Sequence, residues 1–212
     1  MVCLRSVARI MAKQYSEVKN LPFKELKGIS QKTIEIHWGK LYQGYVKKWQ
    51  EIQEKLKVVD KSSVNAVFSD FRELKLEETF ATNAIILHEA YFDVLGLPAE
   101  ASAKAGGEIL ERIKRDFGSF EAWQEEFKAL GLASRGWVIL SFDFNEGRLR
   151  NYLADAHNLY GVWGASPILV LDMYEHAYFI DFGSDKKAYI ESFFQNLNWQ
   201  AVDGKFQKMV KK

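Results

Sequence analysis

The sequence has little of several residue types, and each shortage excludes a class of protein. One cysteine, Cys3, occurs in 212 residues, so no disulfide can form within the chain. A chain this poor in cysteine is typical of a reducing compartment, and we expect a cytoplasmic location. No apolar run reaches the roughly 18 residues that a membrane-spanning helix needs. The net charge of +1 argues against a general nucleic-acid-binding protein, because phosphate binding needs a basic surface.

Hydrophobic residues make up 48% of the chain and aromatic residues 14%, which is enough for a core in one large or two small domains. Residues 1–12 carry two arginines and no acid. They are either a segment like a transit peptide or an over-extended gene start, with Met11 as the initiator. Either way we expect a disordered extension outside the fold. We place a helical-hairpin domain at 13–98 and an α/β domain at 99–212, because residues 96–107 are rich in Gly, Ala and Ser.

Two long helices are predicted in the first domain from apolar residues spaced three or four apart. The first begins after Ser30, a good N-cap, and the second runs over about 64–94 with Ser62 or Ser63 as its cap. A short connection makes them an antiparallel hairpin. The first apolar stripe comprises Ile34, Trp38, Leu41, Tyr45, Trp49, Ile52 and Leu56. The second comprises Val67, Phe71, Leu74, Ala81, Ile85, His88, Phe92 and Leu95.

The second half mixes helices with strands. Two strands, 136–144 and 148–154, flank a tight turn ending in Gly147, and the apolar run 165–171 is a third, buried strand. We therefore expect an α+β fold in which the helical hairpin precedes a small three-stranded antiparallel sheet and its helices. The predicted helices of this half are 108–117, a helix capped by Ser119 that ends near 132, 187–197 and a short final helix.

A carboxylate and an imidazole follow the third strand at Asp172 and His176. Taken alone, such a pair is more often a structural hydrogen bond than a metal site. The chain has only two other histidines before the sheet, His37 and His88, and one after the second strand, His157. His88 lies within the predicted apolar stripe, where a core histidine bonded to a backbone carbonyl is the commoner explanation.

The residues around these histidines resemble a known family. Asp172-Met-Tyr-Glu-His-Ala-Tyr resembles the C-terminal metal motif of the iron/manganese superoxide dismutases. His37, within Ile-Glu-Ile-His-Trp-Gly-Lys, and His88, before Glu-Ala-Tyr-Phe, stand where that family keeps two further ligands. Gly-Tyr-Val after the first ligand, Arg-Gly-Trp at the start of the sheet and Asn-Trp near the end also match. The resemblance covers about residues 20–208.

The resemblance implies a function and a cofactor. The expected activity is conversion of superoxide to oxygen and hydrogen peroxide at a mononuclear site between the two domains. One Fe or Mn ion per subunit is implied, and three imidazoles with one carboxylate suit either metal, so the choice stays open. A homodimer or a tetramer is implied, and neither a nucleic-acid partner nor a membrane is expected. The implied ligands are His37, His88, Asp172 and His176, with one solvent molecule.

It also implies roles around the ligands. Tyr45 matches the family's gateway tyrosine, and His157 matches an outer position whose side chain holds the bound solvent. Trp137 matches an aromatic wall, and Glu175 matches a glutamate that reaches the partner subunit's ligand histidine. Two positions depart from the family. Many members have a histidine and a tyrosine, hydrogen-bonded across the subunit interface, where this chain has Leu41 and Phe179.

Two other hypotheses remain at this stage. Three histidines and one carboxylate would also serve a non-haem iron oxygenase or a metallohydrolase, but these need a substrate pocket, and the aromatics around the ligands leave room only for a small anion. An inactive metal-binding homologue is the other alternative. The intact ligand positions and Tyr45 argue against it, whereas Leu41 and Phe179 keep it open.

Overall fold

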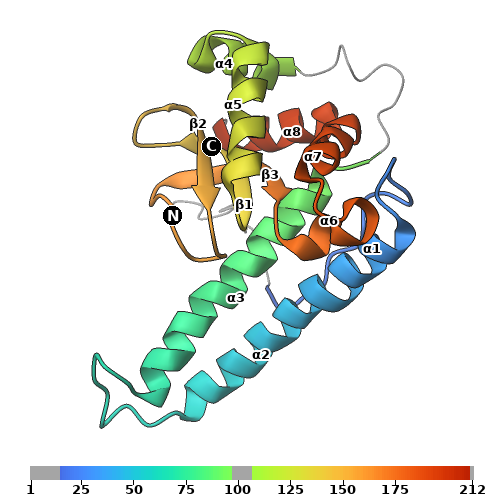
Figure 1. Cartoon of the computed structure of the whole chain (residues 1–212). Coiled ribbons are helices and arrows are strands. Elements are labelled where there is room, and N and C mark those ends of the chain that lie inside the picture. Colours follow the sequence, from blue (N-terminus) through green and yellow to red (C-terminus); the bar gives the residue numbers. More distant parts are fainter. Residues whose placement is uncertain (1–14, 97–106, 211–212) are drawn as a thin grey trace, which may run out of the picture.

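The structure, a computed structural model, describes residues 15–96 and 107–210. A long helical hairpin extends away from a body formed by a sheet and further helices (Figure 1). This confirms the predicted α+β class. The predicted extension 1–12 and the predicted domain boundary at 98 lie outside the described residues. The helices and strands are α1 Gln31–Ile36, η1 His37–Tyr42, α2 Gln43–Val58, α3 Asp70–Asp93, α4 Gly107–Phe117, α5 Phe120–Ala133, β1 Trp137–Asp143, β2 Arg148–Ala154, β3 Ala165–Asp172, α6 Glu175–Phe182, α7 Lys186–Gln195 and α8 Trp199–Val210.

The first long helix contains a π-helical segment that sequence reasoning missed. It begins as predicted, with the Ser30 side chain accepting a hydrogen bond from the Thr33 backbone N–H. Between α1 and α2, η1 is wound as a π-helix, which adds a residue to the turn. The helix face therefore shifts, and Tyr42 and Val46 are buried where the predicted stripe has Leu41 and Tyr45. Both of the latter are half-buried.

The second long helix starts later than predicted. It begins at Asp70, and its N-cap is Ser69, whose side chain accepts a hydrogen bond from the Arg72 backbone N–H. Asn65 holds the preceding segment in a turn, because its side-chain oxygen accepts bonds from the backbone N–H groups of Val67 and Phe68. The prediction of a helix from 64 with a cap at Ser62 or Ser63 is therefore wrong, and Val67 is 90% exposed.

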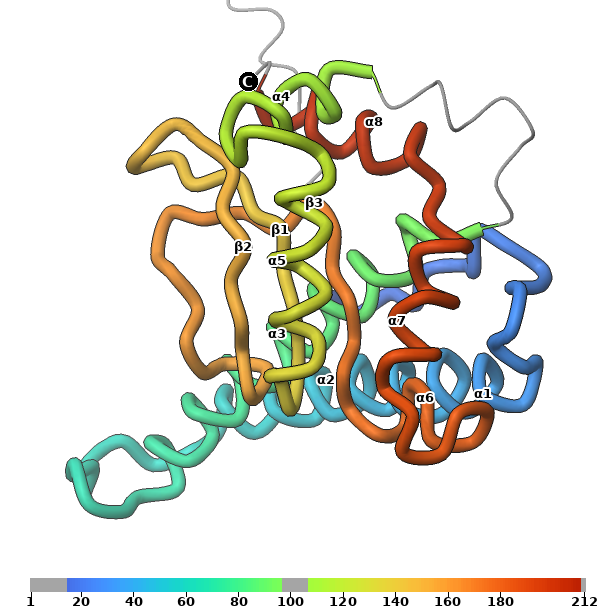
Figure 2. Tube along the Cα trace, turned by 45° about the horizontal axis from the view of Figure 1, so that its top comes forward, coloured from blue at the N-terminus to red at the C-terminus, as the bar shows by residue number. Residues whose placement is uncertain are grey.

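The three predicted strands form one antiparallel sheet in the order β2-β1-β3. Gly147 supplies the positive φ of +64° that the β1–β2 turn needs. In the ladder Trp137 lies opposite Asp172. Helix α5 packs on β1, while α3 packs on β3, so the sheet lies between the hairpin and the later helices (Figure 2).

The last part of the chain covers the end of β3. Helix α6 starts three residues after β3 and was not predicted, whereas α7 matches the expected 187–197 helix to within two residues. The carboxylate of Asp172 accepts a hydrogen bond from the Tyr174 backbone N–H at 2.9 Å, which stabilises the turn from strand to helix. No helix in the described ranges is long and apolar enough to span a bilayer.

We predict that Ser69→Ala lowers the free energy of unfolding by about 1 kcal/mol, because it removes the side-chain oxygen that caps α3. Ser63→Ala is the matched control and should leave stability unchanged. Urea unfolding of both variants measures the difference. Equal losses for the two serines would contradict the observed helix start.

Candidate metal centre

Four side chains from four separate elements converge at the end of β3. His37 comes from η1, His88 from α3, Asp172 from the last position of β3 and His176 from the first turn of α6. Their candidate ligand atoms all lie within 4.8 Å of one another. Asp172 Oδ2 lies 3.0 Å from Nε2 of His37, 3.2 Å from Nε2 of His176 and 3.8 Å from Nε2 of His88. The structure thus brings together all four residues that the sequence predicts as ligands.

The backbone orients His88 for ligation. Its Nδ1 lies 2.7 Å from the carbonyl oxygen of Ala84, one turn earlier in α3. A carbonyl can only accept, so Nδ1 carries the proton and Nε2 presents a lone pair. The hydrogen bond expected of a core histidine is therefore present, but it leaves the other nitrogen free for a metal.

The donor atoms fit a metal cation. Nε2 of His37 and Nε2 of His88 are buried without a hydrogen-bond partner in the described part of the chain. His37 Nε2 approaches Asp172 Oδ2 closely yet makes no properly aligned hydrogen bond with it. A shared cation would satisfy all these lone pairs at once. Three imidazoles, one carboxylate and no thiolate form a site suited to Fe or Mn.

Burial and charge set the protonation states of the four side chains. Burial lowers the pKa of His37 and, more strongly, the pKa of His88, so both imidazoles are neutral near pH 7. Burial alone would raise the pKa of Asp172, but His176 and the contact with His37 outweigh it and the pKa is lowered. Asp172 is therefore a carboxylate. Burial alone would lower the pKa of His176, but the contact with Asp172 outweighs it and the pKa is raised, so metal binding would displace a proton from His176.

Tyr45 and His157 form a second layer beside the ligands. His157 Nε2 lies 3.0 Å from the Tyr45 hydroxyl, and the Trp137 indole N–H donates to His157 Nδ1 at 3.0 Å. Because the indole can only donate, Nδ1 accepts and the proton of the neutral ring is on Nε2. His157 therefore donates to the Tyr45 oxygen, and the proton of that hydroxyl is available for another acceptor.

Aromatic rings enclose the ligands. The Trp137 ring lies 5.1 Å from the ring of His88, and the Tyr91 ring lies 5.1 Å from the ring of His37. Tyr174 stacks on His176 with ring centroids 5.4 Å apart. Sequence reasoning missed Tyr174 as a wall residue, although its position between two predicted ligands could have indicated it.

Two of the three predicted interface residues, Glu175 and Phe179, are exposed on α6, the helix that carries His176. Glu175 is exposed, Phe179 is 55% exposed and Leu41 is half-buried. The side chain of His176 itself is 22% exposed, in contrast to the fully covered Asp172. The ligand cluster therefore lies close to the face that carries Glu175 and Phe179.

We predict that His157 in the metal-free protein titrates with a pKa of about 4, because burial disfavours the imidazolium. In the unfolded chain its pKa is near 6.5, so the histidine makes the free energy of unfolding fall as the pH drops from 6.5 to 4. Ring ¹⁵N NMR should show the Nε2–H tautomer above pH 5 or so. Trp137→Phe should mix the tautomers, and titration near 6.5 in the folded protein would contradict the assignment.

Comparison with known proteins supports the same conclusion. Residues 105–205 match the family described as iron/manganese superoxide dismutases, C-terminal domain. The superoxide dismutase (Fe) of Aquifex aeolicus is 41% identical over 213 residues, covering 97% of this chain and 94% of the relative. That of Aquifex pyrophilus is 43% identical, with 88% of each chain covered. The superoxide dismutase (Mn) 1 of Halobacterium salinarum is 32% identical, covering 85% of this chain and 88% of the relative.

These matches, together with the buried cluster of histidines and aspartate, decide between the three functional hypotheses. They favour neither the oxygenase or hydrolase nor the inactive homologue. The chain belongs to the iron/manganese superoxide dismutase family, and it is an enzyme that converts superoxide to oxygen and hydrogen peroxide.

Proposed function

We propose that His37, His88, Asp172 and His176 hold one Fe or Mn ion per subunit. The observation that carries this proposal is the pair of buried Nε2 atoms, on His37 and His88, that have no hydrogen-bond partner among the described residues. Their lone pairs converge on a carboxylate oxygen, an arrangement that is costly unless a cation lies between them.

Iron is the first metal to test. The relatives from both Aquifex species, at 41% and 43% identity, are named iron enzymes, whereas the relative from Halobacterium, at 32%, is named a manganese enzyme. The donor set accepts either metal, so the ligands alone do not select between them. Loading metal-free protein with each metal and measuring superoxide consumption distinguishes the two.

The bound ion would supply the electron transfer, taking an electron from one superoxide and giving one to another. The residues around the ion would supply protons and exclude bulk water. The Tyr45 oxygen accepts from His157, so the tyrosine's own proton can be donated toward an anion or a solvent molecule at the site. Burial, with the nearby charge of Asp172, raises the pKa of Tyr45, which keeps the hydroxyl protonated near pH 7.

The role of His157 as the group that holds the metal-bound solvent remains a prediction. Both of its ring nitrogens already have partners, the Trp137 indole and the Tyr45 hydroxyl. We propose that Tyr45 and His157 act as one unit, in which Tyr45 contacts the solvent and His157 positions Tyr45.

We propose that the subunits assemble through the face that carries Glu175 and Phe179, as a homodimer or as a tetramer built from such dimers. Support comes from exposure, since Phe179 and the neighbouring Ile180 are large apolar side chains at 55% and 43% exposure. Glu175 would then reach the partner subunit's metal site.

We also propose that the chain divides into domains 13–98 and 99–212 and that the protein is located in the cytoplasm.

We predict that Asp172→Ala and His88→Ala each lose bound metal and activity, because each removes a ligand. His157→Ala is the matched control: it removes a buried histidine beside the cluster and should keep the metal while its reduction potential and turnover change. Elemental analysis, redox titration and a superoxide-consumption assay test all three. Full metal occupancy in either ligand variant would refute the assignment.

Leu41 and Phe179 stand where many family members have a histidine and a tyrosine that are hydrogen-bonded across the subunit interface. Removing both partners of a buried hydrogen bond is nearly neutral, whereas removing one partner costs about 1–3 kcal/mol. We therefore predict that the two apolar side chains pack together across the subunit interface. Leu41→His alone should weaken the assembly, and adding Phe179→Tyr should recover part of the loss.

Sedimentation equilibrium of the wild type, both single variants and the double variant gives the coupling energy. Val67→His, a change at a 90% exposed position far along the hairpin, is the control and should not affect assembly. Additive effects of the two substitutions would show that these side chains do not meet.

A further inference from the structure

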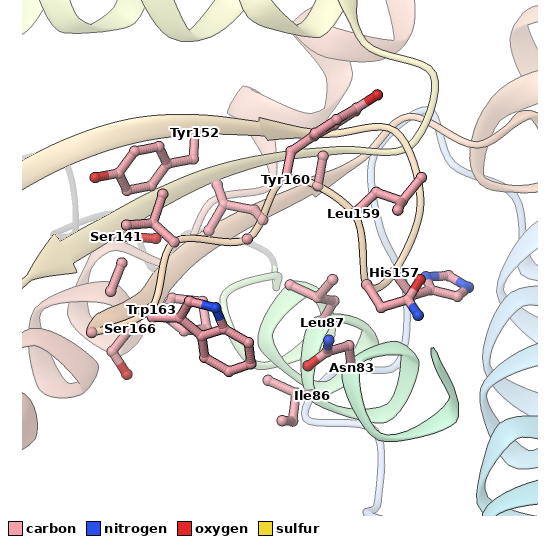
Figure 3. Close-up of a pocket in the computed structure, with 18 residues that line it drawn as sticks. Asn83, Ile86, Leu87, Ser141, Tyr152, His157, Leu159, Tyr160, Trp163 and Ser166 are labelled. Atoms are coloured by element: carbon pink, nitrogen blue, oxygen red, sulfur yellow. The ribbon is translucent and has the colours of Figure 1, made fainter. Parts of the chain in front are cut away.

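A cavity lies between the sheet and α3, beside the metal centre. It has a volume of about 510 Å³, within the range of small-molecule sites. Figure 3 shows its walls: Asn83 and Leu87 on α3, Ser141 on β1 and Tyr152 on β2. The segment from β2 to β3, with His157 near its start, closes the remaining side.

The cavity carries no formal charge. None of the residues that line it is an aspartate, glutamate, lysine or arginine. Its one imidazole, His157, has neutral partners at both ring nitrogens, because Nδ1 accepts from the Trp137 indole and Nε2 faces the Tyr45 hydroxyl. A charged ligand would lose its hydration here without gaining an opposite charge, which is costly. The lining therefore selects a neutral molecule and does not suit the anionic substrate of the metal centre.

Two polar side chains on opposite walls of the cavity, Ser141 and Asn83, have no hydrogen-bond partner among residues 15–96 and 107–210. Ser141 lines the cavity, and its hydroxyl, which is not fully buried, has no hydrogen-bond partner in the described part of the chain. The Asn83 amide, on α3, likewise has none among the described residues. A hydroxyl and an amide on the wall of a cavity can hydrogen-bond to water or to a ligand that enters it. These groups would orient a molecule that carries a hydroxyl or a carbonyl oxygen.

An exposed indole lies at the cavity. Trp163 is 95% exposed although it lines the cavity, and Figure 3 shows its ring on the same side as Ile86 and Asn83. The Tyr152 ring contributes a second aromatic surface from the sheet. Flat aromatic ligands gain from stacking on such rings, and Trp163 would lose exposed apolar surface in doing so.

We propose that this cavity binds a small neutral aromatic molecule with a hydroxyl or carbonyl oxygen. The ring packs against Trp163 and the aliphatic side chains of α3, and the oxygen bonds to Ser141 or Asn83. The site is separate from the metal ligands, and the two share only the neighbourhood of His157.

The test uses two probes that share one ring system. 2-Naphthol is neutral at pH 7, whereas 2-naphthoate carries a carboxylate. We expect isothermal titration calorimetry on the full-length, metal-loaded protein to show saturable binding of 2-naphthol and at least tenfold weaker binding of 2-naphthoate, because the cavity has no cation to pair with the carboxylate.

Two variants locate the site. Trp163→Ala should weaken 2-naphthol binding about tenfold by removing the stacked ring, and Ser141→Ala about threefold to tenfold by removing the hydroxyl. Val67→Ala is the control, since Val67 is similarly exposed but lies in the loop between α2 and α3. Superoxide consumption without the probe should be unchanged in all three, which shows that they fold.

Three results would overturn the proposal. The first is no binding of 2-naphthol up to its solubility limit, and the second is equal binding of the two probes. The third is a loss of assembly on Trp163→Ala: light scattering without probe would show the wild type as an oligomer and the variant as a smaller species. That last result would mean that a second copy of the chain covers the cavity.

Discussion

The buried carboxylate of Asp172 is the constraint on which the rest of the structure depends. Its side chain is fully excluded from solvent and it is ionised, because the surrounding imidazoles lower its pKa. A buried charge without compensation costs several kcal/mol, so the fold must supply positive charge beside it. Three imidazole nitrogens approach one oxygen of this carboxylate, and a cation at their centre would complete the compensation.

Each ligand comes from a different element, so the four ligands meet only when these elements pack together. The hairpin contributes His37 and His88, while β3 of the sheet and the helix that follows it, α6, contribute Asp172 and His176. A bound ion would thus join the two halves of the chain. Because the ligands are far apart in sequence, the metal's binding energy would contribute directly to the stability of the whole fold.

The sequence predicts the parts of this arrangement that local patterns determine. The strand 165–171 and the cap at Ser30 were recognisable because alternation, apolar runs and capping residues act over a few positions. The four ligands were found through resemblance, and the structure brings them together. The same local rules failed at 64–69, where the turn held by Asn65 competes with a helix of suitable periodicity.

Other features depend on tertiary contacts that a pattern does not contain. The π-helical segment at His37 shifts a helix face without any sequence signal that we recognise. The tautomer of His157 depends on Trp137, 20 residues earlier, and on Tyr45, 112 residues earlier. The neutral cavity depends on residues from α3, two strands and one loop, so it appears only when these elements pack.

The central claim is that four side chains bind one ion around the Asp172 carboxylate. X-ray absorption spectroscopy of the iron-loaded or manganese-loaded protein tests it most directly. The account predicts one ion per chain with only nitrogen and oxygen neighbours and the multiple-scattering pattern of three imidazoles. A first shell with fewer imidazoles, a sulfur neighbour, or an ion that occupies an unrelated surface site would contradict it.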